Sequence, residues 1–313
     1  MRSVTILFLA TLIAGCNAAG PSSPEIGSAT SPSEATEVGQ LIDHPNFPSA
    51  FVQSRRITIW LPPKYNVDTA STYPVIYAHD GQNLFYPAQS YSGAEWELDE
   101  TAARLMTAGD IRPAVIVGIW NTDERWQEYA PQKAFEHISL DEVSEQLEAE
   151  LPELKADSYL RFIIEELKPF IDTTYRTKTD ADNTLIMGSS MGGLISLYAA
   201  AEYPNSFSKV AAVSIHWPIA EPDGLVAAQA DRAMQTYLAS SGIDPSQHTI
   251  WFDRGDRTLD ASYAPHAEAM EAWFRDNGWS EDQATFREYP GTDHSENAWA
   301  ERTDDILIFL LSE

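Results

Sequence analysis

The chain has 313 residues, of which 43% are hydrophobic and 21% are charged, so it is long enough for one globular domain with a sizeable core. Its 20 Lys and Arg against 47 Asp and Glu give a net charge of −27, and such a surface repels phosphate backbones, which argues against a nucleic-acid partner. The acidic residues are spread along the chain and form no tail, so we interpret the charge as a contribution to solubility.

The N-terminus has the pattern of an export signal. Residues 4–13 form an apolar run that has the length of a signal-peptide core and is too short to span a membrane. Cys16 is the sole cysteine and follows Ala14 and Gly15 directly, which resembles the bacterial lipoprotein box. The sequence therefore predicts a lipoprotein signal peptide over 1–16, with lipidation at Cys16; a plain secretory signal that is cut nearby is the alternative.

This signal predicts an exported bacterial lipoprotein, periplasmic or cell-surface, that touches the membrane only through its lipid anchor. By the same resemblance, Asn17 in place of Asp favours the outer membrane. Residues 17–45 are rich in Ser, Pro and Ala, a composition that buries too little apolar surface to fold, so we expect a flexible tether there. The folded domain is expected over 46–313.

Short apolar runs along the rest of the chain alternate with segments of helical periodicity. The predicted strands cover residues 51–61, 73–79, 114–120, 184–187, 210–215, 248–252 and 284–289, and the predicted helices cover 159–175, 194–201, 265–277 and the last turns to Leu311. Strands alternating with helices predict an α/β fold with a mostly parallel sheet, helices on both faces, and a site at the carboxyl ends of the strands. Residues 121–158 form an insertion, whose acidic part over 139–153 we expect to be a solvated helix near the site.

A nucleophile motif follows the predicted strand 184–187. The segment Gly188-Ser189-Ser190-Met191-Gly192 matches G-x-S-x-G, and it lies between a short apolar strand and a helical segment, as the nucleophile elbow of an α/β-hydrolase requires. The turn is so tight that its neighbours must be small, a need that Gly188 and Gly192 meet. Ser190 is the predicted nucleophile; a glycine-rich turn without reactivity is the alternative.

A serine hydroxyl needs a base, and the base needs an acid to orient it. His294 is the histidine that lies between the last predicted strand and the terminal helix, where α/β-hydrolases place their base. The acid is expected just after the predicted strand 248–252, and three aspartates follow it. We rank Asp260 first, Asp256 second and Asp253 third.

Two backbone amides are expected to form the oxyanion hole. One belongs to Met191, the residue after the nucleophile, and the other to Gly81 or Gln82, in the turn after the predicted strand 73–79. Such donors act where negative charge develops in the transition state, each contributing roughly 3 kcal/mol.

Further residues lie at predicted strand ends. Asn121, Arg125 and Trp217 are expected to contact substrate, with a solvated loop (Asn121, Arg125) or core packing (Trp217) as the alternatives. His79 and His216 are expected to be structural histidines. The sequence contains no metal-ligand spacing, no phosphate loop and no dinucleotide fingerprint, so neither a metal nor a cofactor is predicted.

Four segments in this order resemble the Putative esterase family of α/β-hydrolases: YAHDGQNLF, FIIEELKPFIDTTYRT, GSSMGGLISLYAAAEYP and DHSENAWAERTDDILIFLL. That family includes enterobactin-type siderophore esterases, feruloyl and acetyl-xylan esterases, S-formylglutathione hydrolases and mycolyltransferases. The resemblance covers about residues 51–313 and implies an ester hydrolase with Ser190 and His294 in its triad. Relatives often read Gly-Thr-x-x-Leu-Asp where this chain has residues 255–260, which supports Asp260 and leaves Asp256 open.

The predicted function is therefore a serine carboxylic-ester hydrolase that acts through an acyl-enzyme. The expected substrate is an extracytoplasmic small-molecule or polysaccharide ester, either a siderophore ester or a plant-polysaccharide ester. The alternatives are an acyltransferase with the same triad and a non-catalytic ligand-binding relative. The sequence predicts no oligomeric state.

Overall fold

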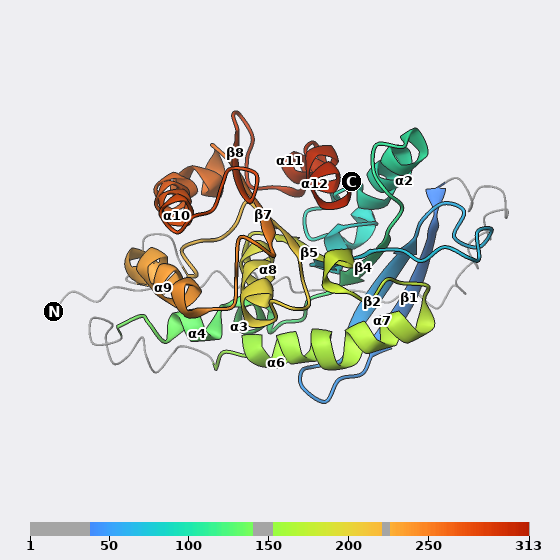
Figure 1. Ribbon diagram of the computed structural model, residues 1–313, viewed down its shortest axis with the longest axis horizontal. Coiled ribbons are helices and arrows are strands. Elements are labelled where there is room, and N and C mark those ends of the chain that lie inside the picture. The colour runs from blue at the N-terminus through green and yellow to red at the C-terminus, as the bar shows by residue number, and fades with distance from the viewer. Residues whose placement is uncertain (1–37, 140–152, 221–225, 313) are drawn as a thin grey trace, which may run out of the picture. The chain divides into compact units, whose positions relative to one another are not determined.

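The computed structural model describes residues 38–139, 153–220 and 226–312 (Figure 1). Eight strands form one sheet: β1 Gln40–Phe47, β2 Arg55–Leu61, β3 Val75–His79, β4 Val115–Ile119, β5 Thr184–Ser189, β6 Lys209–Val213, β7 Thr249–Gly255 and β8 Ala284–Tyr289. Their order in the sheet is β1-β2-β4-β3-β5-β6-β7-β8. β2 pairs antiparallel with β1 and with β4, and all other neighbouring strands are parallel, so the prediction of a mostly parallel sheet is confirmed.

Helices cover both faces of this sheet, as predicted. They are α2 Leu98–Ala108, α3 Arg125–Tyr129, α4 Gln132–Phe135, α6 Ala156–Arg161, α7 Lys168–Thr174, α8 Met191–Glu202, α9 Ala227–Ser240, α10 Ala264–Asp276, α11 Glu296–Ala300 and α12 Thr303–Leu311. Side chains alternate along β3, so that Tyr77 joins one core cluster while Ile76 and Ala78 join the other. The first cluster packs against α6–α10 and the second against α2 and α12.

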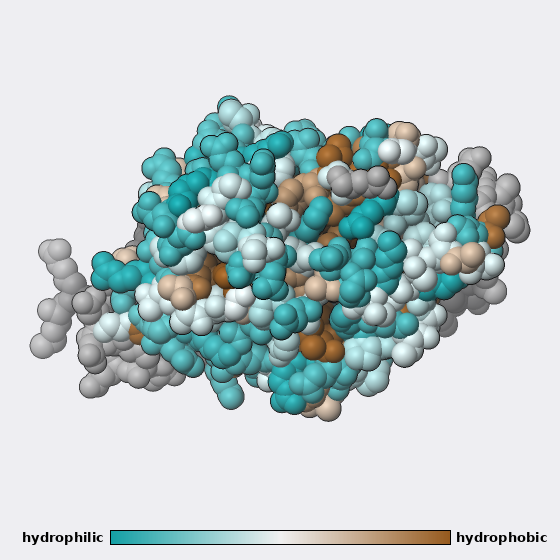
Figure 2. All heavy atoms as spheres, in the orientation of Figure 1, coloured by the Kyte–Doolittle hydropathy of each residue, from teal (hydrophilic) through white to brown (hydrophobic). Residues whose placement is uncertain are grey.

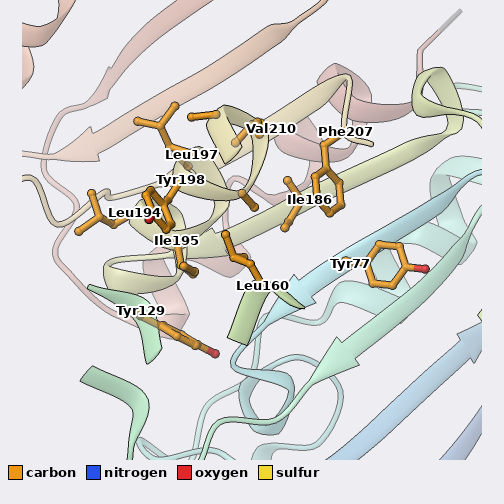
Figure 3. Packing of buried hydrophobic residues seen from close by; sticks show 14 of the residues in the cluster. Tyr77, Tyr129, Leu160, Ile186, Leu194, Ile195, Leu197, Tyr198, Phe207 and Val210 are labelled. Atoms are coloured by element: carbon orange, nitrogen blue, oxygen red, sulfur yellow. The ribbon is translucent and has the colours of Figure 1, made fainter. Parts of the chain in front are cut away.

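The helix α8 is buried over almost its whole length. Every residue of α8 from Met191 to Ala201 is buried, which explains why this segment is apolar all round rather than on one stripe. Figure 3 shows Leu194 and Ile195 of α8 and Ile186 of β5 among the side chains of the first cluster. Each such buried side chain contributes roughly 1.5–3 kcal/mol. This packing fixes the N-terminus of α8, and with it the residue that precedes the helix.

The predicted start of the domain at residue 46 is wrong, because β1 already begins at Gln40, within the expected tether. The sequence of β1, QLIDHPNF, is polar and contains a proline, so no apolar run marks it. β1 is an edge strand and is specified by its pairing with β2, including the contact of Leu41 with Trp60. The expected signal peptide, Cys16 and the tether up to residue 37 lie outside the described residues.

The expected insertion after β4 covers residues 121–158. It contains α3, α4 and the beginning of α6, whereas most of the expected acidic helix, residues 140–152, lies outside the described residues. α6, a π-helical stretch over Phe162–Leu167 and α7 follow one another without a break, and Figure 1 shows them as one long helix. None of the described helices is both long and apolar enough to cross a bilayer. The face in Figure 2 is largely hydrophilic, in keeping with the net charge of −27.

Candidate active site

Ser190 lies at a sharp turn between β5 and α8. Its backbone has φ 57° and ψ −123°, a conformation that residues other than glycine rarely adopt and that costs energy unless its surroundings enforce it. The surroundings do so here: the Ser190 amide donates to the carbonyl of Val213 at 2.9 Å, and the Ser190 carbonyl accepts from the amide of Gly193 at 3.1 Å. The backbone is therefore held in the strained geometry of a nucleophile elbow.

The glycines around Ser190 leave no room for a side chain. A Cβ on Gly188 would lie 2.7 Å from the carbonyl carbon of Gly192, and a Cβ on Gly193 would lie 3.1 Å from Cα of Ala212. The elbow thus needs glycine on both sides, for the steric reason that the sequence motif implies.

His294 lies against Asp260. Its Nδ1 is 2.5 Å from Oδ1 of Asp260, whose side chain is fully buried. The imidazole also makes edge contacts with the rings of Trp299 and Tyr263, at centroid distances of 5.0 and 5.7 Å. The Ser190 side chain lies close to the Tyr263 hydroxyl, so Tyr263 adjoins both Ser190 and His294.

Asp260 is the acid that the structure pairs with His294. Burial opposes ionisation of this carboxyl, but hydrogen bonds from His294, Ser214 and the Gly255 amide outweigh it and hold the pKa below the usual value. Asp256 instead accepts from the Gly291 amide at 2.7 Å, with its side chain 38% exposed.

Asp253, the third candidate acid, is also turned away from His294. Its buried carboxylate bonds to Arg302 at 2.8 Å and to the indole of Trp251 at 2.7 Å. The geometry thus favours Asp260, the aspartate ranked first from the sequence.

The loop after β3 lies beside the elbow. Asp80 has a left-handed backbone, φ 56°, and Gly81 and Gln82 follow it in a buried turn. A Cβ on Gly81 would lie 2.7 Å from the carbonyl carbon of Gly118, so this loop rests directly on β4. The amide of Met191, as the first residue of α8, has no acceptor within the helix. The loop amides and the Met191 amide are thus on the two segments that the sequence assigns to the oxyanion hole.

Asn121 and Arg125, the expected substrate contacts, bind this loop instead. Arg125 donates to both oxygens of Asp80, at 2.8 and 2.7 Å, and the Asn121 amide donates to the same carboxylate at 2.5 Å. Burial opposes ionisation of Asp80, yet Arg125 and Asn121 hold its pKa below the usual value. Asp80 in turn contacts the elbow, because a Cβ on Gly192 would lie 3.3 Å from its Oδ2. These two side chains therefore position the loop.

Trp217 is 1% exposed and packs on Phe252 at a centroid distance of 5.4 Å. It also lines a cavity of about 150 Å³ that lies between the ends of β7 and β8 and the helix α10, with Tyr263 in its wall. Ser190 is not among the residues that line this cavity, so the cavity lies beside the nucleophile and not over it.

His79 and His216 are structural, as expected. His79 Nδ1 lies 2.8 Å from the hydroxyl of Tyr159, and burial lowers its pKa to about 3. Both ring nitrogens of His216 are bonded, one to the hydroxyl of Tyr263 at 2.6 Å, and burial lowers its pKa to about 4. Both imidazoles are therefore neutral at pH 7.

The fold brings to this site three further residues that the sequence does not indicate: Ser214 from a strand end, Tyr263 from a 3₁₀ turn and Arg302 from the segment before α12. None is part of a motif, and only tertiary contacts reveal them. Over residues 38–139, 153–220 and 226–312, no three His, Cys, Asp or Glu side chains gather in a way that could hold a metal ion.

Comparisons with known proteins place the chain in a family. A family model described as Putative esterase matches residues 49–310. Ferri-bacillibactin esterase BesA of Bacillus subtilis (strain 168) is 32% identical over 150 residues, which is 46% of this chain and 49% of that protein. The chain spans about half the length of the curated relatives it matches.

Solved structures of esterases share the fold. A ferulic acid esterase superposes with a TM-score of 0.62 at 19% identity, over 87% of this chain and 98% of the other. The enterobactin esterase FES from Shigella flexneri, in the presence of enterobactin, superposes with a TM-score of 0.63 at 18% identity, over 87% of this chain and 58% of the other. The fold predicted from the sequence is thus confirmed, and this chain belongs to the Putative esterase family.

Proposed function

We propose that the protein is a carboxylic-ester hydrolase that uses Ser190 as its nucleophile, His294 as its base and Asp260 as the acid that orients the base. One observation carries the proposal: a serine held at φ 57° on a strand–helix elbow lies beside Tyr263, whose ring also contacts a histidine with its Nδ1 2.5 Å from a buried aspartate. Strained backbone and an oriented imidazole are the two features that acyl transfer to serine requires.

The steps follow from the orientation of the imidazole. Because Nδ1–H donates to Asp260, Nε2 of neutral His294 is unprotonated and can take the proton of the Ser190 hydroxyl. Oγ attacks the ester carbonyl, the carbonyl oxygen becomes an oxyanion at the amides of Met191 and the Gly81–Gln82 turn, and the alcohol leaves with the proton from His294. Water then repeats the sequence on the acyl-enzyme and releases the acid.

For the substrate, we propose an extracytoplasmic ester, either of a siderophore or of a plant polysaccharide. This is supported by the names of the similar proteins, which include a ferri-bacillibactin esterase, an enterobactin esterase and a ferulic acid esterase. It is also supported by the leader over residues 1–16, from which we propose export and a lipid anchor at Cys16, with the outer membrane as its location.

The test is hydrolysis of p-nitrophenyl acetate and butyrate, methyl ferulate, acetylated xylan, and ferric and iron-free enterobactin, by the wild type and by Ser190→Ala. We expect turnover of at least one ester that falls to the background rate in the variant, with an unchanged circular dichroism spectrum. A fluorophosphonate probe should label the wild type at Ser190, which a non-catalytic relative would not show. Esters formed in the presence of added alcohols would identify an acyltransferase. Full activity of Ser190→Ala would refute the mechanism.

A further inference from the structure

Ser214 is a fully buried serine that the mechanism above does not use. It directly follows β6 and has a left-handed backbone, φ 41°, which is unfavourable for a residue other than glycine. Its hydroxyl lies 2.6 Å from Oδ2 of Asp260, 3.0 Å from Nε1 of Trp299 and 2.7 Å from a guanidinium nitrogen of Arg302. Three partners around one hydroxyl determine where its proton lies.

The indole N–H of Trp299 and the guanidinium of Arg302 can only donate hydrogen bonds. The Ser214 oxygen must therefore accept from both, and its single proton must point to Asp260. Ser214 is thus a fixed donor to Oδ2 of Asp260, the oxygen that also accepts from the Gly255 amide at 2.6 Å, while Oδ1 is left to His294. The carboxylate is held at both ends, which sets the plane in which it meets the imidazole.

A buried ion pair holds Ser214 in turn. The same Arg302 nitrogen that reaches Ser214 lies 2.8 Å from Oδ1 of Asp253, and these two side chains are 2% and 0% exposed. Asp253 also accepts from the Ser214 amide at 2.9 Å, which ties down the unfavourable backbone of that residue. Burial raises the pKa of Asp253, and Arg302 opposes the rise while the charge of Asp260 adds to it, so the ionised form of Asp253 depends on this guanidinium.

The turn after β6 contacts the nucleophile as well. The carbonyl of Val213 accepts from the Ser190 amide at 2.9 Å, and the amide of His216 donates to the Ser190 carbonyl at 3.2 Å. Ser214, one of the two residues between Val213 and His216 in the chain, bonds to Asp260. One four-residue turn therefore touches both the elbow and the acid.

We infer that Ser214 is a positioning residue for Asp260, and that the Asp253–Arg302 pair fixes Ser214 so that the nucleophile and the acid keep their mutual geometry. This inference rests on the proposed function. Ser214 contacts no reacting atom; it acts through Asp260, and Asp260 acts through His294.

The test compares Ser214→Ala and Ser214→Gly with the wild type. Both variants lose the hydroxyl, but glycine adopts φ 41° without strain and alanine does not. The two variants should therefore differ in stability, whereas both should lose catalytic activity. We expect kcat to fall by roughly 10- to 100-fold in each, the effect of losing one hydrogen bond to a charged group, with KM nearly unchanged. The acid limb of the pH–rate profile should move to higher pH. A carboxylate that has lost one hydrogen-bond donor stabilises the imidazolium of His294 more strongly, so the histidine should protonate at a higher pH.

A second readout needs no substrate. The proton between His294 and Asp260 should give a low-field NMR resonance, assigned by its absence in His294→Ala, and this resonance should shift or disappear in both Ser214 variants. Thr184→Val is the matched control: Thr184 is 1% exposed and its hydroxyl donates to a backbone carbonyl at the opposite end of β5, so its loss should leave the rate and the resonance unchanged.

A second perturbation removes the Asp253–Arg302 ion pair and keeps the Ser214 hydroxyl. Asp253→Asn combined with Arg302→Met leaves no unpaired buried charge, so the protein should fold, and we expect a loss of kcat similar to that in Ser214→Ala. The inference is overturned if the Ser214 variants keep kcat within about threefold of the wild type, with the resonance unmoved. A failure of the proposed function is distinct, because Ser190→Ala would then be as active as the wild type.

Discussion

Replacing Asp260 by Asn should shift the proton of the neutral His294 imidazole from Nδ1 to Nε2. In the wild type, Oδ2 of Asp260 accepts from the Ser214 hydroxyl and from the Gly255 amide, both at 2.6 Å. Asn has only one side-chain oxygen. Because the Ser214 hydroxyl and the Gly255 amide both need an acceptor, this oxygen takes the place of Oδ2. The Asn NH₂ group then takes the place of Oδ1 and faces Nδ1 of His294.

A donor that faces Nδ1 forces the imidazole into the other tautomer. Nδ1 must accept, so the proton moves to Nε2, which can then no longer take a proton from Ser190. We expect kcat to fall by roughly 10⁴-fold, the loss seen when the triad acid of another serine hydrolase is changed in this way. That corresponds to about 5 kcal/mol in the activation free energy. KM should change little, because Asp260 is fully buried and does not contact substrate.

The assay is steady-state hydrolysis of a p-nitrophenyl ester by wild type, Asp260→Asn and Asp256→Asn, with thermal unfolding as the check on folding. Asp256→Asn is the matched control, because this half-exposed carboxylate bonds to the Gly291 amide and not to His294. It should keep kcat within a few-fold of the wild type. The reasoning is refuted if Asp260→Asn keeps more than about a tenth of the activity, or if Asp256→Asn is the variant that loses it.

Three further outcomes follow from the structure. Gly188→Ala should cost about 2 kcal/mol or more of unfolding free energy, measured by chemical denaturation, because its Cβ would lie 2.7 Å from the carbonyl carbon of Gly192; wild-type stability would contradict this. The pKa of Asp80 is depressed in the fold, so its contribution to stability is present above the unfolded value near 3.9 and is lost as pH falls through the folded value. The unfolding free energy of Asp80→Asn should therefore depend less on pH than that of the wild type below about pH 5, and equal slopes would count against the assignment. Cys16→Ala should abolish labelling by palmitate and release the protein from the membrane fraction, whereas retention there would exclude the proposed anchor.

The sequence predicts best the parts of the fold that are buried on both faces. β3, β4 and β5 are short apolar runs that end at turn residues, and each was located to within about two residues. β1 was missed because an edge strand is specified by its neighbour and not by its own apolar pattern. α9 was missed as well: its apolar face consists largely of alanines, which give a weak periodic signal.

The candidate site also contains residues that the sequence predicts and contacts that only the fold reveals. Ser190, His294 and Asp260 can be proposed from the sequence because their expected roles depend on chain order and on the residue types at each turn. Asn121 and Arg125 were correctly placed beyond a strand end, but their partner could not be foreseen. Only the fold shows that Asp80, in its left-handed conformation, presents a buried carboxylate to both side chains.

The distribution of charge leads to a last prediction, which concerns substrate class. Arg125 and Arg302 are each bonded to an aspartate, which neutralises both arginines locally, and the net charge of the chain is −27. An anionic ester should therefore be repelled at long range, whereas a neutral ester should not. Salt screens this repulsion over a Debye length of about 10 Å at 0.1 M. We expect kcat/KM for ferric enterobactin, an anionic complex, to rise several-fold between roughly 10 and 200 mM NaCl, and that for methyl ferulate to stay nearly constant. Equal salt dependence of kcat/KM for the two esters would show that the electrostatic field of the whole protein does not reach the site. A fall of kcat/KM with salt for the anionic ester would point to a local basic patch that overrides the net charge.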